Sequence, residues 1–139
     1  MKSVLLSIIL TFYCLISYGQ DKPFEHLDFI IGQWAGTGTG FGNNTSAIES
    51  EFRYVRDSSF IEVRNESRFE PTDENPEGEH HIDHGFISFD KSRKLIVFRQ
   101  FSIEGYVNQY ILNNTLSDEV TMVFETELIE NFVQGGKAR

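Results

Sequence analysis

The chain is 139 residues long and acidic, with 21 Asp and Glu against 12 Lys and Arg and a formal net charge of −9. This length supplies one hydrophobic core and is too short for two domains. An acidic domain repels phosphate backbones and anionic lipid, so the charge argues against nucleic-acid binding and against attachment to a membrane surface. The aromatic residues, 13 Phe, 5 Tyr and 1 Trp, favour strands.

The N-terminus has the three parts of a secretory signal peptide. Lys2 provides a positive start, the apolar run Val4–Ile16 follows, and Ser17-Tyr18-Gly19 offers a cleavage site with small residues at its first and third positions. We therefore expect a signal peptide over residues 1–19, export to the periplasm or the extracellular space, and one mature domain over residues 20–139.

Two other interpretations of this segment agree less well with its residues. The apolar run is shorter than the ~20 residues that a membrane-spanning helix needs, so no membrane insertion is expected after cleavage. Lipoprotein processing at Cys14 is disfavoured by the bulky Tyr13 that precedes it. Because Cys14 is the one cysteine of the chain, the mature domain has no thiol for a disulfide, a metal site or a nucleophile.

The first segment of the mature domain predicts a short lead-in and then a glycine-rich strand. Asp28–Gly32 is expected to be helical or irregular and to end at the glycine, while Gln33–Gly40 carries Gly36, Gly38 and Gly40 at alternate positions. In a strand this spacing places all three on one face, where another backbone or a bulky ring can approach. A phosphate-binding glycine loop would need a preceding strand and a following helix, and neither is predicted here.

The following segments alternate with the period of two that indicates half-buried strands. Ile48–Tyr54 sets apolar and small polar residues against Glu and Arg, and Ile61–Phe69 does the same. We interpret the Glu and Arg rows as solvated outer faces that pair across strands. An acidic stretch with two prolines, Glu70–Asp83, is expected to be a solvated loop. Four more strands are expected at His81–Phe89, Leu95–Ser102, Tyr106–Leu112 and Val120–Ile129.

Seven candidate strands joined by short polar turns predict an all-β fold, an antiparallel meander. Such meanders close into barrels or pack as sandwiches, because both arrangements protect strand edges. We expect a β-barrel.

The opening residues Phe29-Ile30-Ile31-Gly32-Gln33-Trp34-Ala35-Gly36-Thr37-Gly38-Thr39-Gly40 resemble the start of calycin-type, lipocalin-like barrels. These include the nitrobindin-like haem-binding barrels of the nitrobindin/fatty-acid-binding-like superfamily and their uncharacterised exported bacterial relatives. The stretches Asp83–Asp90, Phe98–Phe101 and Gly105–Tyr110 are similar to those exported relatives. The resemblance implies a meander barrel. Nitrobindin-like proteins hold the haem iron with a histidine close to the C-terminus, and no histidine follows His84 here, so haem is not expected and the cofactor is left open.

Barrels of this kind have more strands than the sequence supplies. The final residues, Gly135–Arg139, look like a turn and the first residues of another strand. We therefore expect a barrel that is incomplete at its C-terminus. Its open edges, at Gln33–Gly40 and Val120–Ile129, would permit self-association.

The inferred barrel interior is the candidate functional site, because apolar walls with a few polar groups are typical of small-ligand sites. Arg99 is the most specific candidate, since a charge in an apolar strand must be paired or face an anion; the alternative is an Arg that reaches outward or pairs with a carboxylate. Inward positions are also expected for Phe52, Val63, Ser67, Phe101, Met122 and Phe124. The candidate ligand contacts are Trp34, Tyr54, Asn65, Arg99, Tyr106, Asn108 and Tyr110.

Neither a metal site nor a catalytic residue is assigned. His80 and His84 would lie ~13 Å apart on an extended strand, too far to chelate one ion, so we interpret His80, His81 and His84 as a solvated loop-to-strand junction. No serine stands in a nucleophile-elbow context. We expect a binding module for a small apolar or amphipathic ligand. The alternatives are a hydrolase or isomerase that uses interior polar groups, or an envelope structural or interaction protein with a filled core.

Overall fold

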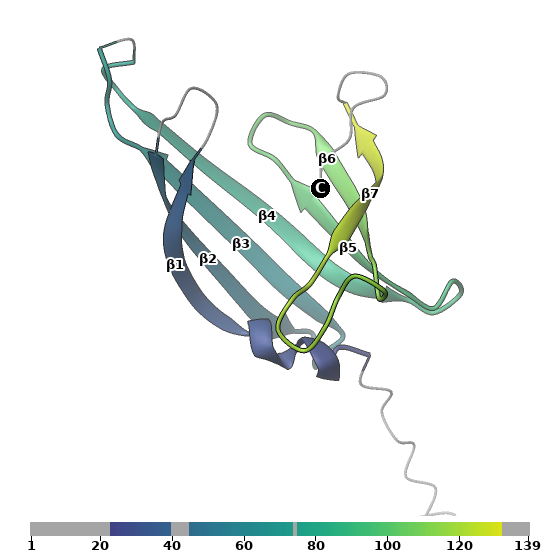
Figure 1. Ribbon diagram of the computed structural model, residues 1–139. Helices are drawn as coiled ribbons and strands as arrows, with labels where there is room; N and C mark the ends of the chain where they lie inside the picture. Colours follow the sequence, from purple (N-terminus) through teal and green to yellow (C-terminus); the bar gives the residue numbers. More distant parts are fainter. Residues whose placement is uncertain (1–22, 40–44, 74, 132–139) are drawn as a thin grey trace, which may run out of the picture.

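The structure, a computed structural model, describes residues 23–39, 45–73 and 75–131 and forms one antiparallel sheet (Figure 1). Its seven strands lie in chain order, each hydrogen-bonded to its sequence neighbours. A short 3-10 helix precedes them. The bounds are η1 Glu25–Ile30, β1 Gly32–Thr39, β2 Thr45–Val55, β3 Phe60–Phe69, β4 Glu79–Asp90, β5 Leu95–Phe101, β6 Val107–Leu112 and β7 Phe124–Glu130. The predicted antiparallel meander is confirmed.

Two predictions fall on residues outside this description: the signal peptide over residues 1–19 and the turn at residues 135–139. Within the described residues, no helix has the length and apolar character required to cross a membrane.

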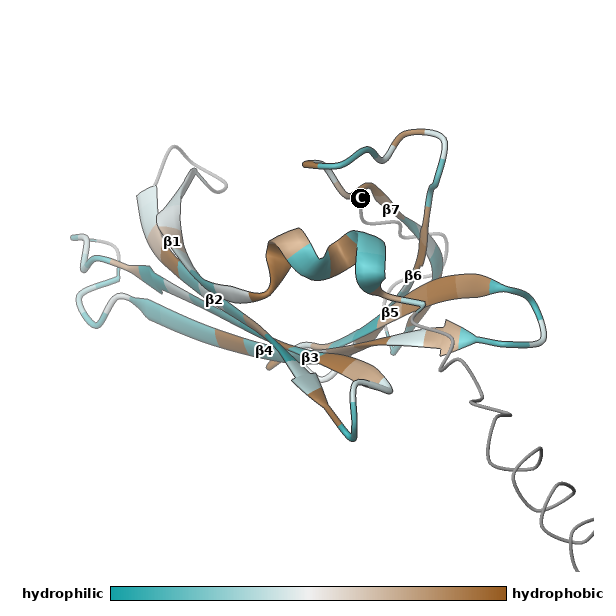
Figure 2. Ribbon diagram, turned by 90° about the horizontal axis from the view of Figure 1, so that it is seen from below, coloured by the Kyte–Doolittle hydropathy of each residue, from teal (hydrophilic) through white to brown (hydrophobic). Residues whose placement is uncertain are grey.

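The sheet is curved but not closed. Among the described residues, β1 and β7 each pair with one neighbour only and not with each other, so the sheet is not closed into a barrel. The open edges lie at the first and last strands, as expected for an incomplete barrel. Figure 2 shows η1 lying against the concave side of this sheet. The concave side is therefore the interior of the molecule, and the convex side faces away from the helix.

The hydrophobic core lies between η1 and the concave face. Phe24, Leu27 and Ile30 of the helical segment are buried against the sheet. Burying each such side chain stabilises the fold by about 1.5–3 kcal/mol. The helix gives way to β1 at Gly32, whose φ of 133° is a conformation that other residues rarely adopt. The sheet side of the core is formed by Ile61, Val63, Ile87, Ile96 and Leu112.

The register confirms the predicted alternation. Phe52 pairs with Val63, which in turn pairs with Gly85, and Tyr54, Ile61 and Ile87 form the parallel row below them. Residues at the intervening positions therefore point to the convex face, including most of the Glu and Arg rows.

One residue of those rows is not solvated as expected. Glu66 is on the convex face, yet it is only 4% exposed. Arg64 and Arg68 both form salt bridges with its carboxylate, and His80 Nε2 lies 2.7 Å from its Oε1. These three side chains cover the Glu66 carboxylate and provide charged or hydrogen-bonding partners for its oxygens. A charge can therefore be buried there.

Strand starts also differ from the prediction: β2 begins at Thr45 instead of Ile48, and the starts of β4 and β7 have local causes. β4 begins already at Glu79, because Glu79 pairs with Phe69 and shortens the acidic loop. β7 begins only at Phe124, since Asp118 holds the preceding segment in a turn: its Oδ1 accepts a hydrogen bond from the Val120 N–H at 2.9 Å. Such local side-chain bonds compete with strand pairing, and they leave Val120 78% exposed.

Candidate functional site

The concave face divides into two halves. Near η1 it is apolar. Farther along the strands a row of polar residues crosses it, in which Ser50 pairs with Asn65 and Asn65 pairs with Asp83. Gln100 joins this row to the far side of the sheet, because its Nε2 donates to Asp83 Oδ2 at 2.7 Å and it pairs with Asn108 on β6. A ligand on this face would meet hydrogen-bonding groups above an apolar floor.

Asn108 is the most deeply buried member of the row. It is 7% exposed, and its Oδ1 accepts no hydrogen bond from any described residue. An unpaired buried polar atom costs about 1–3 kcal/mol. The cost falls when a water molecule or a ligand brings a donor to that oxygen.

A cleft of about 460 Å³ opens at the end of this polar half, where the β3–β4 loop faces the β5–β6 turn. Phe69 and Tyr106 contribute aromatic rings to its wall, and Ser67 contributes a hydroxyl. Four carboxylates also line it, those of Glu70, Glu79, Asp83 and Glu104, and the rest of the wall comes from Thr72, Asn75, Gly78 and His81. The cleft thus combines apolar rings with several carboxylates in a volume suited to a small molecule.

His81 stands between two of these carboxylates. Its Nε2 lies 3.0 Å from Glu79 Oε2 and its Nδ1 lies 3.0 Å from Glu104 Oε1. The hydrogen bond to Glu79 is the main cause that raises the pKa of His81 above 6.5, and Glu104 adds to it. The ring also meets Phe69 edge-on, with centroids 6.2 Å apart. Both ring nitrogens can donate only when the imidazole is protonated, so this geometry favours the imidazolium.

These groups do not form a metal centre. Within the described ranges, no three His, Cys, Asp or Glu side chains are arranged so that they could hold a metal ion.

Four of the sequence candidates lie at or near the polar half. Asn65 and Asn108 belong to the polar row, and Tyr106 lines the cleft. Tyr110 is buried beside the row and stacks on Phe98, with ring centroids 5.7 Å apart. Burial is the main cause that raises its pKa.

Two other candidates hold the helix in place. The Trp34 indole Nε1 donates to the Ile30 carbonyl at 2.7 Å. The Tyr54 hydroxyl donates to Asp28 Oδ1 at 2.5 Å and lies 3.3 Å from the Phe24 carbonyl. Burial, together with that hydrogen bond, raises the pKa of Tyr54 to about 12. Their polar atoms are therefore engaged with η1 and lie away from the cleft.

Arg99 is not on the concave face. It is exposed on β5 opposite Phe86 and Gln109, and Phe101 is exposed on the same convex face. The expectation that these two residues point inward is wrong. In the apolar run of β5, Ile96 and Phe98 face the core. Arg99 directly follows Phe98, so the alternation of a strand turns it to the opposite, convex face.

The sequence interpretation placed His81 in a solvated junction and did not assign it to a site with its two carboxylate partners, Glu79 and Glu104. The alternation of β4 does place His81 and Asp83 on one face, which was a usable signal. Glu104 is 23 residues away from His81 and comes from a turn, so no spacing rule brings it to the histidine.

No protein-family model matches the chain, and comparisons with curated proteins and with solved structures also give no match.

Proposed function

We propose that this chain is a small-molecule binding module whose ligand is amphipathic and carries a positive charge or several hydrogen-bond donors. The ligand occupies the cleft beside His81. The observation that carries the proposal is the convergence of the carboxylates of Glu79, Asp83 and Glu104 with the rings of Phe69 and Tyr106 around one opening.

Each part of the cleft contributes to this choice of ligand. Carboxylates attract ammonium groups and accept hydrogen bonds from hydroxyls, while aromatic faces attract cations and apolar groups. His81 is the one basic side chain in the cleft wall, and its two carboxylate partners offset its charge. An anionic ligand such as a fatty acid would meet repulsion there.

An enzyme is the second candidate, and His81 is the observation that favours it. A histidine held by two carboxylates, with a raised pKa, can act as a general acid in a hydrolase or isomerase. Chemical conversion of a bound ligand would favour this candidate, and stable binding favours the first. A structural or interaction protein with a filled core is the third, since η1 already fills the apolar half of the concave face.

Export and the relation to calycin-like barrels are part of the same proposal. Export is supported by Lys2, the apolar run Val4–Ile16 and the small residues that follow it. The barrel relation is supported by the glycine-rich opening motif and by the antiparallel meander order of the strands.

The test uses two fluorescent probes with the same dansyl group. Dansylcadaverine ends in an ammonium group, and dansylundecanoic acid ends in a carboxylate. We expect fluorescence titration to show saturable binding of the amine only, weakened about tenfold when Asp83→Asn or Glu104→Gln removes one charge, since tenfold corresponds to ~1.4 kcal/mol.

The matched control is Glu119→Gln, which removes one charge from the exposed β6–β7 loop outside the cleft. It should bind the amine as the unmodified chain does. Equal binding of both probes, or equal loss in the control, would contradict the proposal.

A further inference from the structure

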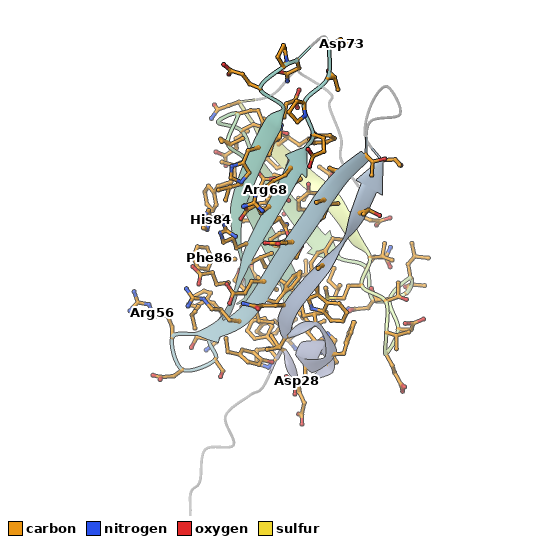
Figure 3. All side chains as sticks on the ribbon, turned by 90° about the vertical axis from the view of Figure 1, so that its left-hand side faces the viewer. Asp28, Arg56, Arg68, Asp73, His84 and Phe86 are labelled. Atoms are coloured by element: carbon orange, nitrogen blue, oxygen red, sulfur yellow. The ribbon has the colours of Figure 1, made fainter. Side chains whose placement is uncertain are left out.

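The convex face carries a cluster of exposed aromatic side chains, which we name the Phe patch: Phe60, Phe86 and Phe101. They are 39%, 41% and 47% exposed. Phe86 on β4 lies in the centre, because Phe60 pairs with Ser88 and Phe101 pairs with His84, each two residues from it. Diagonal neighbours at this spacing are within reach of aromatic side chains. Figure 3 labels Phe86 and His84, which project from the same face of the sheet.

No described segment covers the Phe patch. η1 and the β6–β7 loop lie on the opposite, concave side (Figure 2). A hollow of about 540 Å³ is present over the patch, and its floor is the sheet itself. Three large aromatic residues gathered on one exposed face indicate an interaction surface, whereas single exposed apolar residues do not.

Arginines border the same hollow. Arg53 is engaged by Glu62, with its Nε 2.6 Å from Glu62 Oε2. Arg56, in the β2–β3 turn, and Arg99, on β5, also line it. Neither forms an ion pair with any described residue. Glu127 interacts electrostatically with Arg99 without a salt bridge to it. Two cations without a salt-bridge partner beside three phenylalanines are unexpected in a chain with a net charge of −9.

We propose that the Phe patch, with Arg56 and Arg99, is the docking surface for a partner protein segment that presents carboxylates next to apolar side chains. Aromatic residues and Arg are the types that dominate protein–protein interfaces. The carboxylates of the partner pair with the two guanidinium groups, which have no salt-bridge partner among the described residues, and its apolar side chains enter the hollow between the rings.

Other occupants fit these observations less well. The hollow lies on an exposed sheet face and would leave a small ligand largely in solvent, whereas ligand sites bury most of their ligand. Extended polyanions such as nucleic acid or an anionic membrane would also meet the net negative charge of the chain. A second copy docking through the same patch would bring four guanidinium groups of like charge into one interface, since a twofold interface uses the same residues of both copies.

The test is selection of a phage-displayed library of random dodecapeptides against the immobilised full chain. We expect the enriched peptides to combine Asp or Glu with neighbouring Phe, Leu, Trp or Tyr. A fluorescein-labelled consensus peptide should then bind in an anisotropy titration. Its affinity should fall at least tenfold in Arg99→Glu and in Phe86→Ser, and should fall with rising salt.

Two control variants separate the patch from general effects of charge and exposure. Lys91→Glu makes the same charge change in the exposed β4–β5 turn, and Leu116→Ser removes an apolar side chain that is 49% exposed in the β6–β7 loop. Both should bind the consensus peptide as the unmodified chain does, and circular dichroism should show an intact sheet in all four variants.

Several outcomes would overturn the proposal. No enrichment, enriched peptides without acidic residues, or unchanged affinity in both patch variants would each do so. Binding of phosphatidylserine vesicles or of oligo(dT) that is lost in Arg99→Glu would assign the surface to a membrane or a nucleic acid instead. The dansyl-amine titration does not involve this face, so the two proposals fail independently.

Discussion

At the scale of single residues, hydrogen-bond partners decide what each polar side chain can do. Trp34 and Tyr54 donate to η1 and hold the helix on the sheet. His81 is different, because both of its ring nitrogens meet carboxylates in an open cleft. The fold therefore acts on the protonation state of His81.

We expect His81 to titrate above the ordinary histidine pKa of 6.5, and Glu79→Gln to lower its pKa more than Glu104→Gln does. The reason is that the hydrogen bond to Glu79 is the largest cause of the raised pKa, and the contribution of Glu104 is smaller. The measurement is an NMR pH titration of the histidine Cε1–H signals, assigned with His81→Gln.

The raised pKa also sets the direction of a stability change. The folded state holds the His81 proton more tightly than the unfolded chain does, so its stabilising contribution is complete below pH 6.5. The contribution is lost as the pH rises through the raised pKa. In His81→Gln this part of the pH dependence of the free energy of unfolding should disappear. An unchanged pH profile would show that the carboxylate pair does not act on the folded state.

At the scale of elements, neighbouring atoms pack directly against the backbone at some glycines of the sheet but not at others. Gly85 of β4 sits where a Cβ atom would come within 2.6 Å of both the Arg99 carbonyl oxygen and the Phe98 ring. At Gly36 of β1 a Cβ would meet nothing within 4 Å. The predicted role of alternate glycines as places of close approach is therefore not general along β1.

The two glycines make a matched pair of substitutions. Gly85→Ala should lower the free energy of unfolding by about 2 kcal/mol, because backbone atoms of β5 must move to admit the methyl group. Gly36→Ala should leave it nearly unchanged, or raise it by a few tenths of a kcal/mol through a less flexible unfolded chain. Urea unfolding followed by circular dichroism measures both. A larger loss at Gly36 than at Gly85 would contradict this account of the strand packing.

At the scale of the whole molecule, the open sheet is the dominant feature. Among the described residues, β1 and β7 are the two edge strands, since each is hydrogen-bonded to one neighbouring strand. Such edges are templates for pairing with another chain. The sequence expectation of self-association through open edges rests on this geometry and stays a prediction.

We expect the chain to self-associate with rising concentration in sedimentation velocity, and Ala35→Lys to reduce that association. Ala35 is exposed on the edge strand β1, and lysines on edge strands oppose pairing with another edge. Leu116→Lys adds the same charge to the β6–β7 loop and should leave the association unchanged. If the chain stayed monomeric at every concentration, the edge strands would not mediate self-association.

Most of the strand order could be predicted from the sequence. The period-two pattern of Ile61–Phe69 and the turns at Arg56–Ser59 and Asp90–Lys94 locate strands to within a few residues, because both signals are local. The candidate site was less predictable. Asn65, Tyr106 and Asn108 were predicted from the alternation that turns their side chains toward the interior. The cleft, in contrast, depends on where the β5–β6 turn with Glu104 lies in the fold.

The amino-acid sequence by itself determined the all-β class, the meander order and the face of nearly every residue on β2–β4, since alternate side chains on a strand point to opposite sides whatever surrounds them. Only the tertiary structure decided that the sheet curves around η1, that Arg99 faces outward and that Glu104 reaches His81. The position of η1 depends on the curvature of the sheet, and the contact of Glu104 with His81 depends on segments far apart in the chain. The direction of Arg99 depends on which alternate residues of a continuously apolar strand face the core. None of these is encoded in a local pattern.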